Sequence, residues 1–582
     1  MNNVGSAKEQ FDSEADALKQ IIYEFIDSGH ILMAAQVFEQ YSLLNPTDPD
    51  LDEIRNVLYP QGNETVKQEI PDEYKILNDI ETIFILSGII TKRTGYIDSV
   101  LRKIRLFEEN WNYSPILLTC IHNIDHRKAL TWLRTAFGGQ IALSADTRVL
   151  NVYEYFQNSY ADGLENKAVY RDNDKDEPSS RSKKYYTGYM GSLRTECFFD
   201  ENGNTAKELI YDDWGYLNCV YEYSKVSMDI YDAMYFTTDG RLCIKAAYRY
   251  DTYDKIPKMK IELYDDDGNV AAQCNSNAEL AAICLDEIAS EQKFNMLVVE
   301  DGLMSKAATD FVKGKKRAAA CEVIHSIFLN DANDKKSGPQ QYYEHLCNNF
   351  NKFDAVITLT DAARLDFEEI HKISPDTKPS MFVIPHMYPF DVDRIDFEQR
   401  DKRKAVIVAR LDTNKQIGSA VEIFLRVVEQ LPDATLEIYG RGPREDDIRA
   451  QIKNLGLEKN VFLMGFTDEP LAVFNKGVLS MMTSAAEGFG LTIMESICNG
   501  CPAFSFDIKY GPSDIISEGK TGFLIPNYDG TMYAEKIVEY LKDENMQQVM
   551  SENCYNAAGK FGKDKFLENW YNMTDFVYRS KT

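Results

Sequence analysis

The fold of the C-terminal half follows from residues 484–495, which read Ser484-Ala-Ala-Glu487-Gly-Phe-Gly-Leu-Thr-Ile-Met-Glu495. An apolar run, Val478–Met482, comes before them and is typical of a buried strand, whereas a helical pattern begins near Leu491. Gly488 and Gly490 let backbone N–H groups approach a ligand closely, and the N-terminus of the following helix favours a phosphate group. The stretch therefore predicts a strand, a ligand-binding turn and a helix.

Two glutamates frame this turn. Glu487 lies in the loop before the expected helix, and Glu495 lies about one turn into it, so both carboxylates can face one ligand. A carboxylate held there can accept hydrogen bonds from sugar hydroxyls. Taken as an isolated pair, the two residues are more often a helix cap and a solvated helix glutamate.

Further strands are predicted upstream of this turn. The apolar, β-rich runs lie near 404–409, 435–439 and 461–464, and helical patterns separate them, which indicates a parallel sheet. Arg410 and Lys415 follow the first of these strands. Arginine offers a planar fork for phosphate oxygens and lysine a compact charge. Because successive strand ends meet at one edge of a parallel sheet, we expect Arg410, Lys415 and both glutamates to share one cleft.

The N-terminal half repeats the strand–helix alternation in two parts. Strands are predicted at 80–86, 114–120, 294–300, 321–325 and 354–360, and residues 97–107 have a helical pattern. Residues 385–390 are expected to form a linker. Two such lobes joined by a linker form a cleft, where ligands bind at the carboxyl ends of the strands.

A block with a different sequence pattern interrupts the first lobe. Hairpin turns are predicted at Asn202-Gly203, Asp239-Gly240 and Asp267-Gly268, between alternating, tyrosine-rich runs. Its most polar stretch, Asp172–Lys184, is expected to be a mobile loop. We therefore expect an α/β protein with these parts: a helical extension (1–70), the first lobe (74–150 and 285–388), an antiparallel β insertion (151–284), a second lobe (389–562) and a C-terminal helix (563–582).

The helical extension leaves two interpretations open. Gly29, Ala34, Phe38 and Pro46 fall where a tetratricopeptide repeat has its small, aromatic and terminating positions. One repeat of this kind predicts a helical hairpin for docking. An N-terminal helical cap on the next domain explains the same pattern equally well.

Composition limits the function. The 582 residues include 64 Lys and Arg against 92 Asp and Glu, a net charge of −28, which excludes general nucleic-acid binding. The chain has no run of 18 apolar residues and no secretory signal pattern at residues 1–20, so we expect a cytoplasmic protein, with peripheral contact to the inner face of the membrane as an option. The 11 scattered cysteines fit reduced core thiols.

The combination of these motifs resembles the retaining family-4 glycosyltransferases of GT-B fold. Their signature is an R-x4-K pair, here Arg410 and Lys415, and an E-x7-E motif with a G-F-G turn, here Glu487–Glu495. Gly500-Cys-Pro502 and Glu518–Leu524 match further segments of the family. The resemblance covers about 300 to 560 with high specificity and 74 to 150 more weakly. It implies two Rossmann-like lobes, the second of which binds a nucleotide sugar.

The resemblance implies a role for each motif residue. Arg410 and Lys415 would bind the donor diphosphate and stabilise the leaving nucleotide. His325 would lie near the reacting sugar, although a lone histidine at a strand end is more often structural. The remaining donor-binding positions would be Glu487 and the amides of Gly488, Phe489, Gly490 and Leu491 for the sugar and phosphate, Glu495 for the ribose, and Gly465-Phe466-Thr467 for a uracil base.

The resemblance also bears on mechanism, cofactors and partners. It implies anomeric retention, by front-face attack or through a covalent intermediate on Glu487, without a metal ion or other cofactor. The β insertion resembles that of teichoic acid α-glycosyltransferases and of transferases that begin O-glycosylation of Ser/Thr-rich adhesins. We expect a UDP-sugar donor carrying N-acetylglucosamine or glucose, and a Ser/Thr-rich protein as acceptor, with teichoic acid as the alternative. A homo-oligomer or a hetero-partner would use the β insertion or the N-terminal helices.

Rival interpretations are weaker. A non-catalytic acceptor-binding partner of a glycosyltransferase is the main alternative, and the presence of all four cleft residues argues against it. Gly440–Glu445 is only a partial dinucleotide fingerprint. Cys498 and Cys501 have C-x-x-C spacing without a second pair. The triplets Asp174–Asp176 and Asp265–Asp267 are typical of polar turns, so no metal site is expected.

Overall fold

The computed structural model describes residues 18–23, 26, 34, 38, 41, 48, 50–58, 69–88, 95–123, 129, 133, 143–144, 147–157, 182–185, 193–212, 217–225, 227, 229–249, 258–388, 394–467, 469–526 and 528–582. The chain divides into two compact units, Met1–Ala320 with Lys581–Thr582, and Cys321–Ser580. Within the described ranges, no helix combines the length and the apolar character needed to cross a bilayer. All eleven cysteines lie in those ranges, where each is buried and none forms a disulfide.

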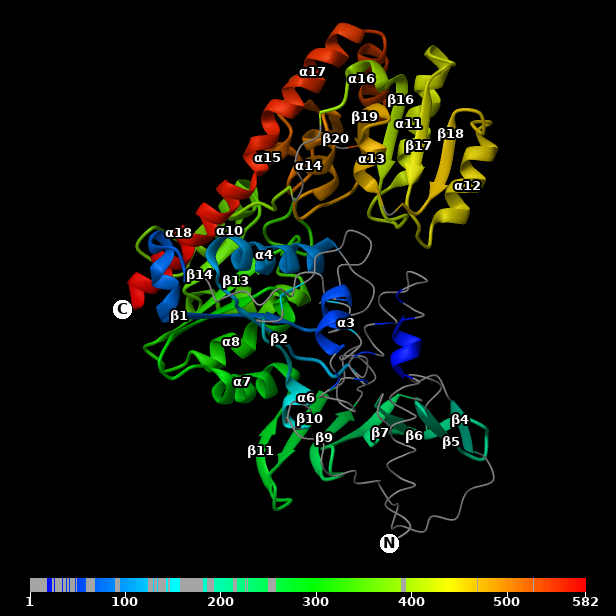
Figure 1. The fold of residues 1–582 in the computed structure, drawn as a ribbon. Helices are drawn as coiled ribbons and strands as arrows, with labels where there is room; N and C mark the ends of the chain where they lie inside the picture. Colours follow the sequence, from blue (N-terminus) through cyan, green and yellow to red (C-terminus); the bar gives the residue numbers. More distant parts are fainter. Residues whose placement is uncertain are drawn as a thin grey trace. The chain divides into compact units, whose positions relative to one another are not determined.

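The first unit contains a parallel sheet. Strands β12 (Phe294–Val299), β1 (Ile80–Leu86), β2 (Ile116–Thr119) and β3 (Val149–Asn151) lie side by side in that order, and β1 and β2 are labelled in Figure 1. β12 and β2 are buried along their whole length, as is typical of parallel strands covered on both faces. The expected strands and their parallel pairing are thus confirmed. The described helices near this sheet in the sequence are α4 (Gly95–Trp111), α6 (Val152–Phe156), α7 (Asn277–Ile288), α8 (Ser305–Phe311) and the 3-10 helices Asp72–Asp79 and Gly302–Met304.

The predicted insertion is an eight-stranded antiparallel sheet. Each strand pairs with its neighbour in the chain, so the order is β11-β10-β9-β8-β7-β6-β5-β4 (Figure 1). Gly203, Gly240 and Gly268 have φ of 85°, 86° and 80°, which confirms the three expected hairpin turns. The strands are β4 (Ser182–Tyr185), β5 (Thr195–Phe199), β6 (Thr205–Tyr211), β7 (Leu217–Tyr223), β8 (Ile230–Phe236), β9 (Leu242–Arg249), β10 (Lys258–Tyr264) and β11 (Val270–Cys274).

One part of the predicted mobile loop is wrong. Ser182–Lys184 belong to the edge strand β4, where Lys183 lies opposite Cys197 of β5. All four residues of β4 are exposed, so backbone pairing forms this strand without an apolar pattern that the sequence would reveal. Asp172–Arg181, the rest of that prediction, lies outside the described residues.

The described N-terminal positions have a core of their own. Helix α3 (Leu51–Leu58) contributes Leu51 and Ile54 to an apolar cluster. The other buried members are Leu18, Ile22, Ala34, Phe38 and Tyr41. Ala34 and Phe38 are therefore buried, as the helical pattern predicts, whereas Gly29 and Pro46 lie outside the described residues.

The second unit begins with a short run of parallel strands. β15 (Ser380–Val383) pairs with β14 (Ala355–Thr358), and β14 pairs with residues 321–324 of β13 (Ala318–Ile324). Helix α10 (Asp361–His371) follows β14, and Thr360 caps its N-terminus by accepting from the N–H of Ala363. The other helices are α9 (Glu344–Asn348) and the 3-10 helices Gln341–Tyr343 and Phe350–Lys352.

A six-stranded parallel sheet fills most of the second unit. Its order is β18-β17-β16-β19-β20-β21, so the chain leaves β16 toward one side and later crosses back to β19 on the other side. This reversal creates a crevice at the carboxyl ends of β16 and β19, where ligands bind in folds of this class. The strands are β16 (Asp401–Val408), β17 (Thr435–Tyr439), β18 (Val461–Gly465), β19 (Gly477–Met482), β20 (Ala503–Phe506) and β21 (Gly522–Ile525).

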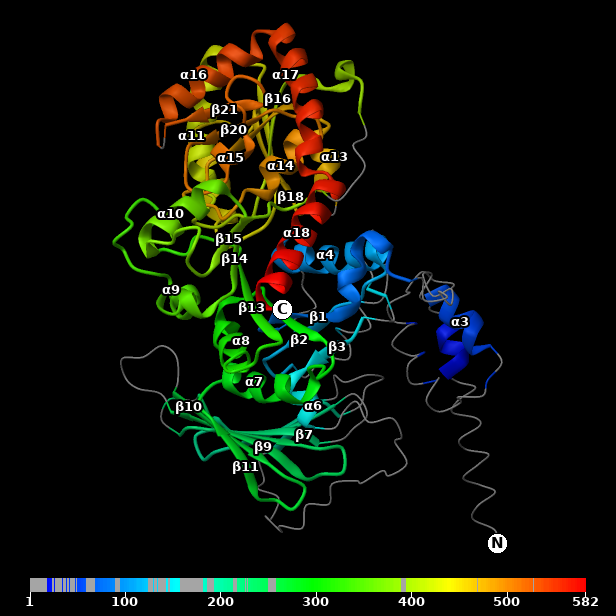
Figure 2. The same cartoon turned by 90° about the vertical axis from the view of Figure 1, so that its left-hand side faces the viewer.

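Helices flank this sheet. α11 packs with α12 and α16, whereas α14 packs with α13 and α17. Figure 2 shows α16 near α11, and α13 near α14. The last helix, α18, brings Phe576 within 5.7 Å of the Phe382 ring on β15. The helices are α11 (Ile417–Gln430), α12 (Glu445–Asn454), α13 (Pro470–Phe474), α14 (Leu491–Cys498), α15 (Pro512–Ile515), α16 (Gly530–Leu541), α17 (Glu544–Ala557) and α18 (Lys563–Lys581), with 3-10 helices at Phe397–Gln399 and Ala558–Phe561.

Candidate active site

The loop after β16 carries the two predicted cations. Asp412 organises it, because its carboxylate accepts from the Lys415 N–H at 3.1 Å and from Arg410 Nε at 2.5 Å. Burial alone would raise the pKa of Asp412, but these hydrogen bonds hold it below its usual value. The Arg410 side chain is 75% exposed. The loop therefore presents a guanidinium to solvent at the carboxyl end of β16.

The loop after β19 is joined to the loop after β16. Lys415 Nζ lies 2.5 Å from Glu487 Oε1, and both side chains are largely buried. The N–H of Ala485 donates to the Asn414 carbonyl at 2.8 Å, and Asn414 Nδ2 donates to the Ala486 carbonyl at 3.0 Å. The structure thus confirms that the cation loop and the glutamate loop meet at one edge of the sheet.

Gly488 fixes where the glutamate loop meets His325. A Cβ at Gly488 would lie 2.1 Å from the His325 carbonyl oxygen, so only glycine fits here. The backbone N–H groups of His325 and Ser326 both donate to the Tyr343 hydroxyl at 3.1 Å. Burial raises the pKa of Tyr343 to about 12, so the hydroxyl stays protonated. His325 is therefore held directly beside the Glu487–Gly490 turn.

A second histidine, which the sequence did not single out, lies next to His325. The His386 and His325 rings are stacked, with centroids 5.6 Å apart and planes 17° apart. The Phe489 ring meets His386 edge-on at 5.3 Å and is itself buried. His386 lies in the stretch expected to be a linker, and the available signal was its position two residues after the apolar run Met381–Ile384, which was not predicted as a strand.

Helix α14 begins where the sequence predicts. Its N-cap is Gly490, with φ of +100°, a left-handed conformation that favours glycine. No side chain caps this helix, and uncapped first-turn N–H groups are a common binding site for phosphate. Glu495 lies half-buried one turn into the helix.

The predicted base-binding residues lie at the end of β18. Gly465 has φ of 80°, and its carbonyl accepts from the Gly440 N–H at 2.8 Å. The Phe466 side chain is 63% exposed, so its ring is available for stacking. A Cβ at Gly440 would lie 1.8 Å from the Ala409 carbonyl oxygen. Close packing against the end of β16 thus explains the partial dinucleotide fingerprint.

The remaining motifs behave as structure. Asp265 accepts from the N–H groups of Asp267 and Asn269, which confirms a turn role for that triplet. Cys498 and Cys501 are buried, and burial raises the pKa of Cys498 to about 12. In the part of the chain that the structure describes, no three His, Cys, Asp or Glu residues form a group that could hold a metal ion. Asp174 and Asp176 lie outside that part.

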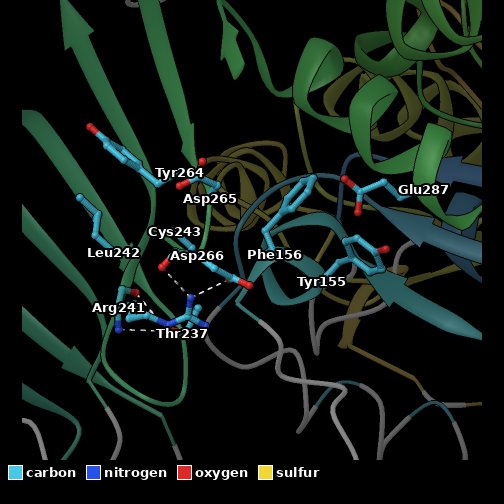
Figure 3. A pocket seen from close by; sticks show the side chains of 10 residues that line it. All are labelled: Tyr155, Phe156, Thr237, Arg241, Leu242, Cys243, Tyr264, Asp265, Asp266 and Glu287. Atoms are coloured by element: carbon cyan, nitrogen blue, oxygen red, sulfur yellow. Dashed lines mark hydrogen bonds and ion pairs between the residues drawn. The ribbon is translucent and has the colours of Figure 1, made fainter. Parts of the chain in front are cut away.

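Among the described residues, one cavity lies away from the predicted site residues and another lies beside the cation loop. One, of about 350 Å³, lies in the first unit, where Arg241 pairs with Asp239 at 2.8 Å and with Asp266 at 2.6 Å (Figure 3). None of the predicted site residues lines it. The other, of about 320 Å³, borders the cation loop at Asp412 and the start of α11.

The region of the six-stranded sheet is similar to known proteins. Residues 391–557 match the family described as glycosyl transferases group 1, and Arg410, Lys415 and the Glu487–Glu495 stretch all fall inside this region. The chain is 26% identical over 524 residues to a poly(glycerol-phosphate) alpha-glucosyltransferase of Bacillus subtilis, covering 85% of this chain and 75% of that protein.

A second relative is the GtfA subunit of a UDP-N-acetylglucosamine–peptide N-acetylglucosaminyltransferase of Streptococcus gordonii. It is 30% identical over 242 residues, covering 40% of this chain and 47% of that protein. Among solved structures, a TarM variant of S. aureus, in complex with fondaparinux, alpha-GlcNAc-glycerol and UDP, has a TM-score of 0.68 at 19% identity, covering 86% of this chain and 99% of TarM. The chain has a GT-B fold, and its residues 391–557 match the family of group 1 glycosyl transferases.

Proposed function

We propose that this chain is a retaining glycosyltransferase that moves N-acetylglucosamine or glucose from a UDP-sugar to hydroxyls of a polymeric acceptor. The observation that carries the proposal is the contact between the two strand-end loops, in which Lys415 pairs with Glu487 at 2.5 Å inside the matched region. That contact places a cation and a sugar-binding carboxylate within reach of one nucleotide sugar. The relatives named above support the donor class.

The chemistry follows from these groups. The acceptor oxygen forms a bond to the anomeric carbon while the bond from that carbon to the diphosphate breaks, and the acceptor proton passes to the departing phosphate. Negative charge develops on the diphosphate, where Arg410 and Lys415 would stabilise it. A covalent intermediate on Glu487 is the second route compatible with retention. The amides at the start of α14 would bind a phosphate oxygen.

We also propose that the reaction needs no metal ion. Two fixed cations at the end of β16 can supply the positive charge that a metal supplies in other transferases. The rate of UDP release should therefore be the same in excess EDTA as in excess magnesium. A rate that falls in EDTA and returns with magnesium would refute this part of the proposal.

A donor screen tests the reaction itself. Purified protein is mixed separately with UDP-N-acetylglucosamine, UDP-glucose, UDP-galactose and GDP-mannose, and release of the nucleoside diphosphate is followed. We expect release from one of the first two donors. If no donor is consumed and UDP does not bind, the chain is a non-catalytic partner of another transferase instead.

Two acceptors have specific support. One acceptor is a polyol phosphate, which is supported by the similarity to the poly(glycerol-phosphate) enzyme over 85% of the chain. The other is a Ser/Thr-rich protein, which is supported by the higher identity to the peptide-modifying relative. The net charge of −28 also supports the protein acceptor, because it disfavours binding of a polyanion. Poly(glycerol phosphate) and a Ser-rich peptide should be supplied side by side, and the anomeric coupling of the product measured by NMR. An α-linked product on one acceptor supports the proposal, and a β-linked product refutes retention.

A further inference from the structure

We propose that Asp366, on helix α10, is a positioning residue that holds the donor-binding turn Glu487–Phe489 in place through the segment Lys509–Gly511. The inference rests on the proposed function, which assigns Glu487 to the donor sugar. Asp366 lies 121 positions away from Glu487 in the chain. Lys509 and Tyr510 connect the two, because each contacts both Asp366 and Glu487.

The segment Lys509–Gly511 runs directly along the donor-binding turn. The Tyr510 N–H donates to the Glu487 carbonyl at 2.7 Å, and the Glu487 N–H donates to the Lys509 carbonyl at 3.3 Å. A Cβ at Gly511 would lie 1.6 Å from the Phe489 carbonyl oxygen, so the two backbones are in contact there as well. The position of Lys509–Gly511 therefore sets the position of the Glu487 backbone.

Asp366 fixes that segment from the other side. Its Oδ2 accepts from Lys509 Nζ at 2.5 Å and from the Tyr510 hydroxyl at 3.0 Å, and its Oδ1 lies 3.0 Å from Lys335 Nζ. The residue is 5% exposed. Burial alone would raise the pKa of Asp366, but the donors around it hold the pKa below its usual value, so the carboxylate is charged. Tyr510 also stacks on Phe328, with ring centroids 6.1 Å apart.

Other contacts hold the surroundings of Asp366 without it. The Asp361 N–H, at the start of α10, donates to Asp514 Oδ1 at 2.8 Å, so α10 keeps a separate tie to the region after Gly511. The Glu487 carboxylate keeps its partner Lys415. Loss of the Asp366 charge should therefore shift the Glu487 backbone while the fold and the phosphate-binding cations remain. A misplacement of about 1 Å near reacting groups can cost about 10²-fold in rate.

The test uses two variants of the full chain. Asp366→Asn keeps the side-chain shape but removes the charge, and Tyr510→Phe keeps the ring stack but removes one donor. We expect kcat for donor turnover to fall about 10- to 100-fold in Asp366→Asn and less in Tyr510→Phe, with the double variant no slower than Asp366→Asn alone. The Kd for UDP should change less than about threefold, since Arg410 and Lys415 are untouched.

The matched control is Glu369→Gln on the same helix. Glu369 pairs with Lys335 at 2.7 Å but does not contact Lys509 or Tyr510 in the described structure, so kcat should be unchanged. Hydrogen exchange supplies a readout independent of turnover. In Asp366→Asn, peptides covering 484–491 and 508–514 should exchange faster, while peptides from β16 and β17 should not.

The outcomes separate the inference from the proposed function. An Asp366→Asn protein with wild-type kcat and wild-type exchange would overturn the positioning role. An equal loss of UDP affinity and kcat, or an equal loss in Glu369→Gln, would show a general structural role and overturn it too. A wild-type protein that neither binds UDP nor consumes a donor would refute the proposed function itself, whatever the exchange data show.

Discussion

At the scale of single residues, the site depends on a few close contacts between loops. Lys415 and Glu487 are 72 positions apart in the chain and pair at 2.5 Å. Neither residue is convincing alone, because isolated charges on loops are usually solvated. The sequence could predict their proximity because both follow strands of one parallel sheet. It could not predict His386 or Asp366, whose roles depend on packing between distant segments that local patterns do not encode.

Replacing Lys415 tests the cation role. Lys415→Ala should leave the fold intact and lower turnover by about 10²- to 10³-fold, because the proposed function makes Lys415 a fixed donor to the leaving diphosphate. Lys459→Ala is the control, since Lys459 is exposed in the loop before β18, at the opposite end of the sheet. Initial rates of UDP release give the comparison. Unchanged turnover in Lys415→Ala would show that Lys415 does not bind the diphosphate.

Replacing Gly488 tests the contact between the turn Glu487–Phe489 and His325. Gly488→Ala would place a Cβ 2.1 Å from a backbone oxygen, so the turn must move. We expect the free energy of unfolding to fall by about 1–3 kcal/mol, as is typical of overpacking, and the activity to be lost. Gly559→Ala is the control, because a Cβ there meets nothing within 4 Å. Equal melting temperatures and activities for the two variants would contradict the contact.

At the scale of elements, the alternation of apolar runs and helical patterns predicted most of the parallel strands, but not the short strands β3, β15, β20 and β21. A parallel strand is buried on both faces, so its sequence is nearly continuous in apolar residues and easy to recognise. Strand β4 was missed because it is an exposed edge strand without such a run. The cation loop is a third case: its conformation depends on Asp412, which accepts hydrogen bonds from both ends of the loop.

The pKa of Asp412 makes a prediction about pH. Its folded-state pKa is lowered, so Asp412 stabilises the fold above the usual aspartate pKa of about 3.9, and this contribution is lost as the pH falls through the lower folded value. Wild type should therefore melt at a higher temperature than Asp412→Asn from pH 6 to 8. Thermal unfolding followed by circular dichroism should show the gap narrowing below about pH 4. A difference in melting temperature that is the same at all these pH values would contradict the stabilising role of the Asp412 carboxylate.

At the scale of the whole molecule, the proposed donor site lies within one unit. His325, Arg410, Lys415, Glu487 and Glu495 all belong to Cys321–Ser580. The described N-terminal residues, by contrast, form an apolar cluster among themselves. The GT-B fold could be predicted because the motifs resemble those of a known family and the strand–helix alternation occurs in two lobes. The acceptor could not, since its recognition depends on surface shape.

Truncation tests this division of labour. A chain lacking residues 1–70 should still release UDP from its donor at close to the wild-type rate, because the predicted donor residues all lie downstream. Transfer to a polymeric acceptor is measured in parallel and should fall if the extension serves docking. Loss of donor turnover from a folded truncation would contradict the separation.

The central claim is that the loops after β16 and β19 bind the diphosphate of a UDP-sugar. Calorimetric titration of UDP into wild type and Arg410→Ala, both in EDTA, tests it most directly. The account predicts one UDP per wild-type chain and binding at least about tenfold weaker in Arg410→Ala, since a charge-assisted hydrogen bond contributes about 1.5–3 kcal/mol. Equal affinity in the two proteins, or binding by wild type only when a divalent metal is added, would contradict the account.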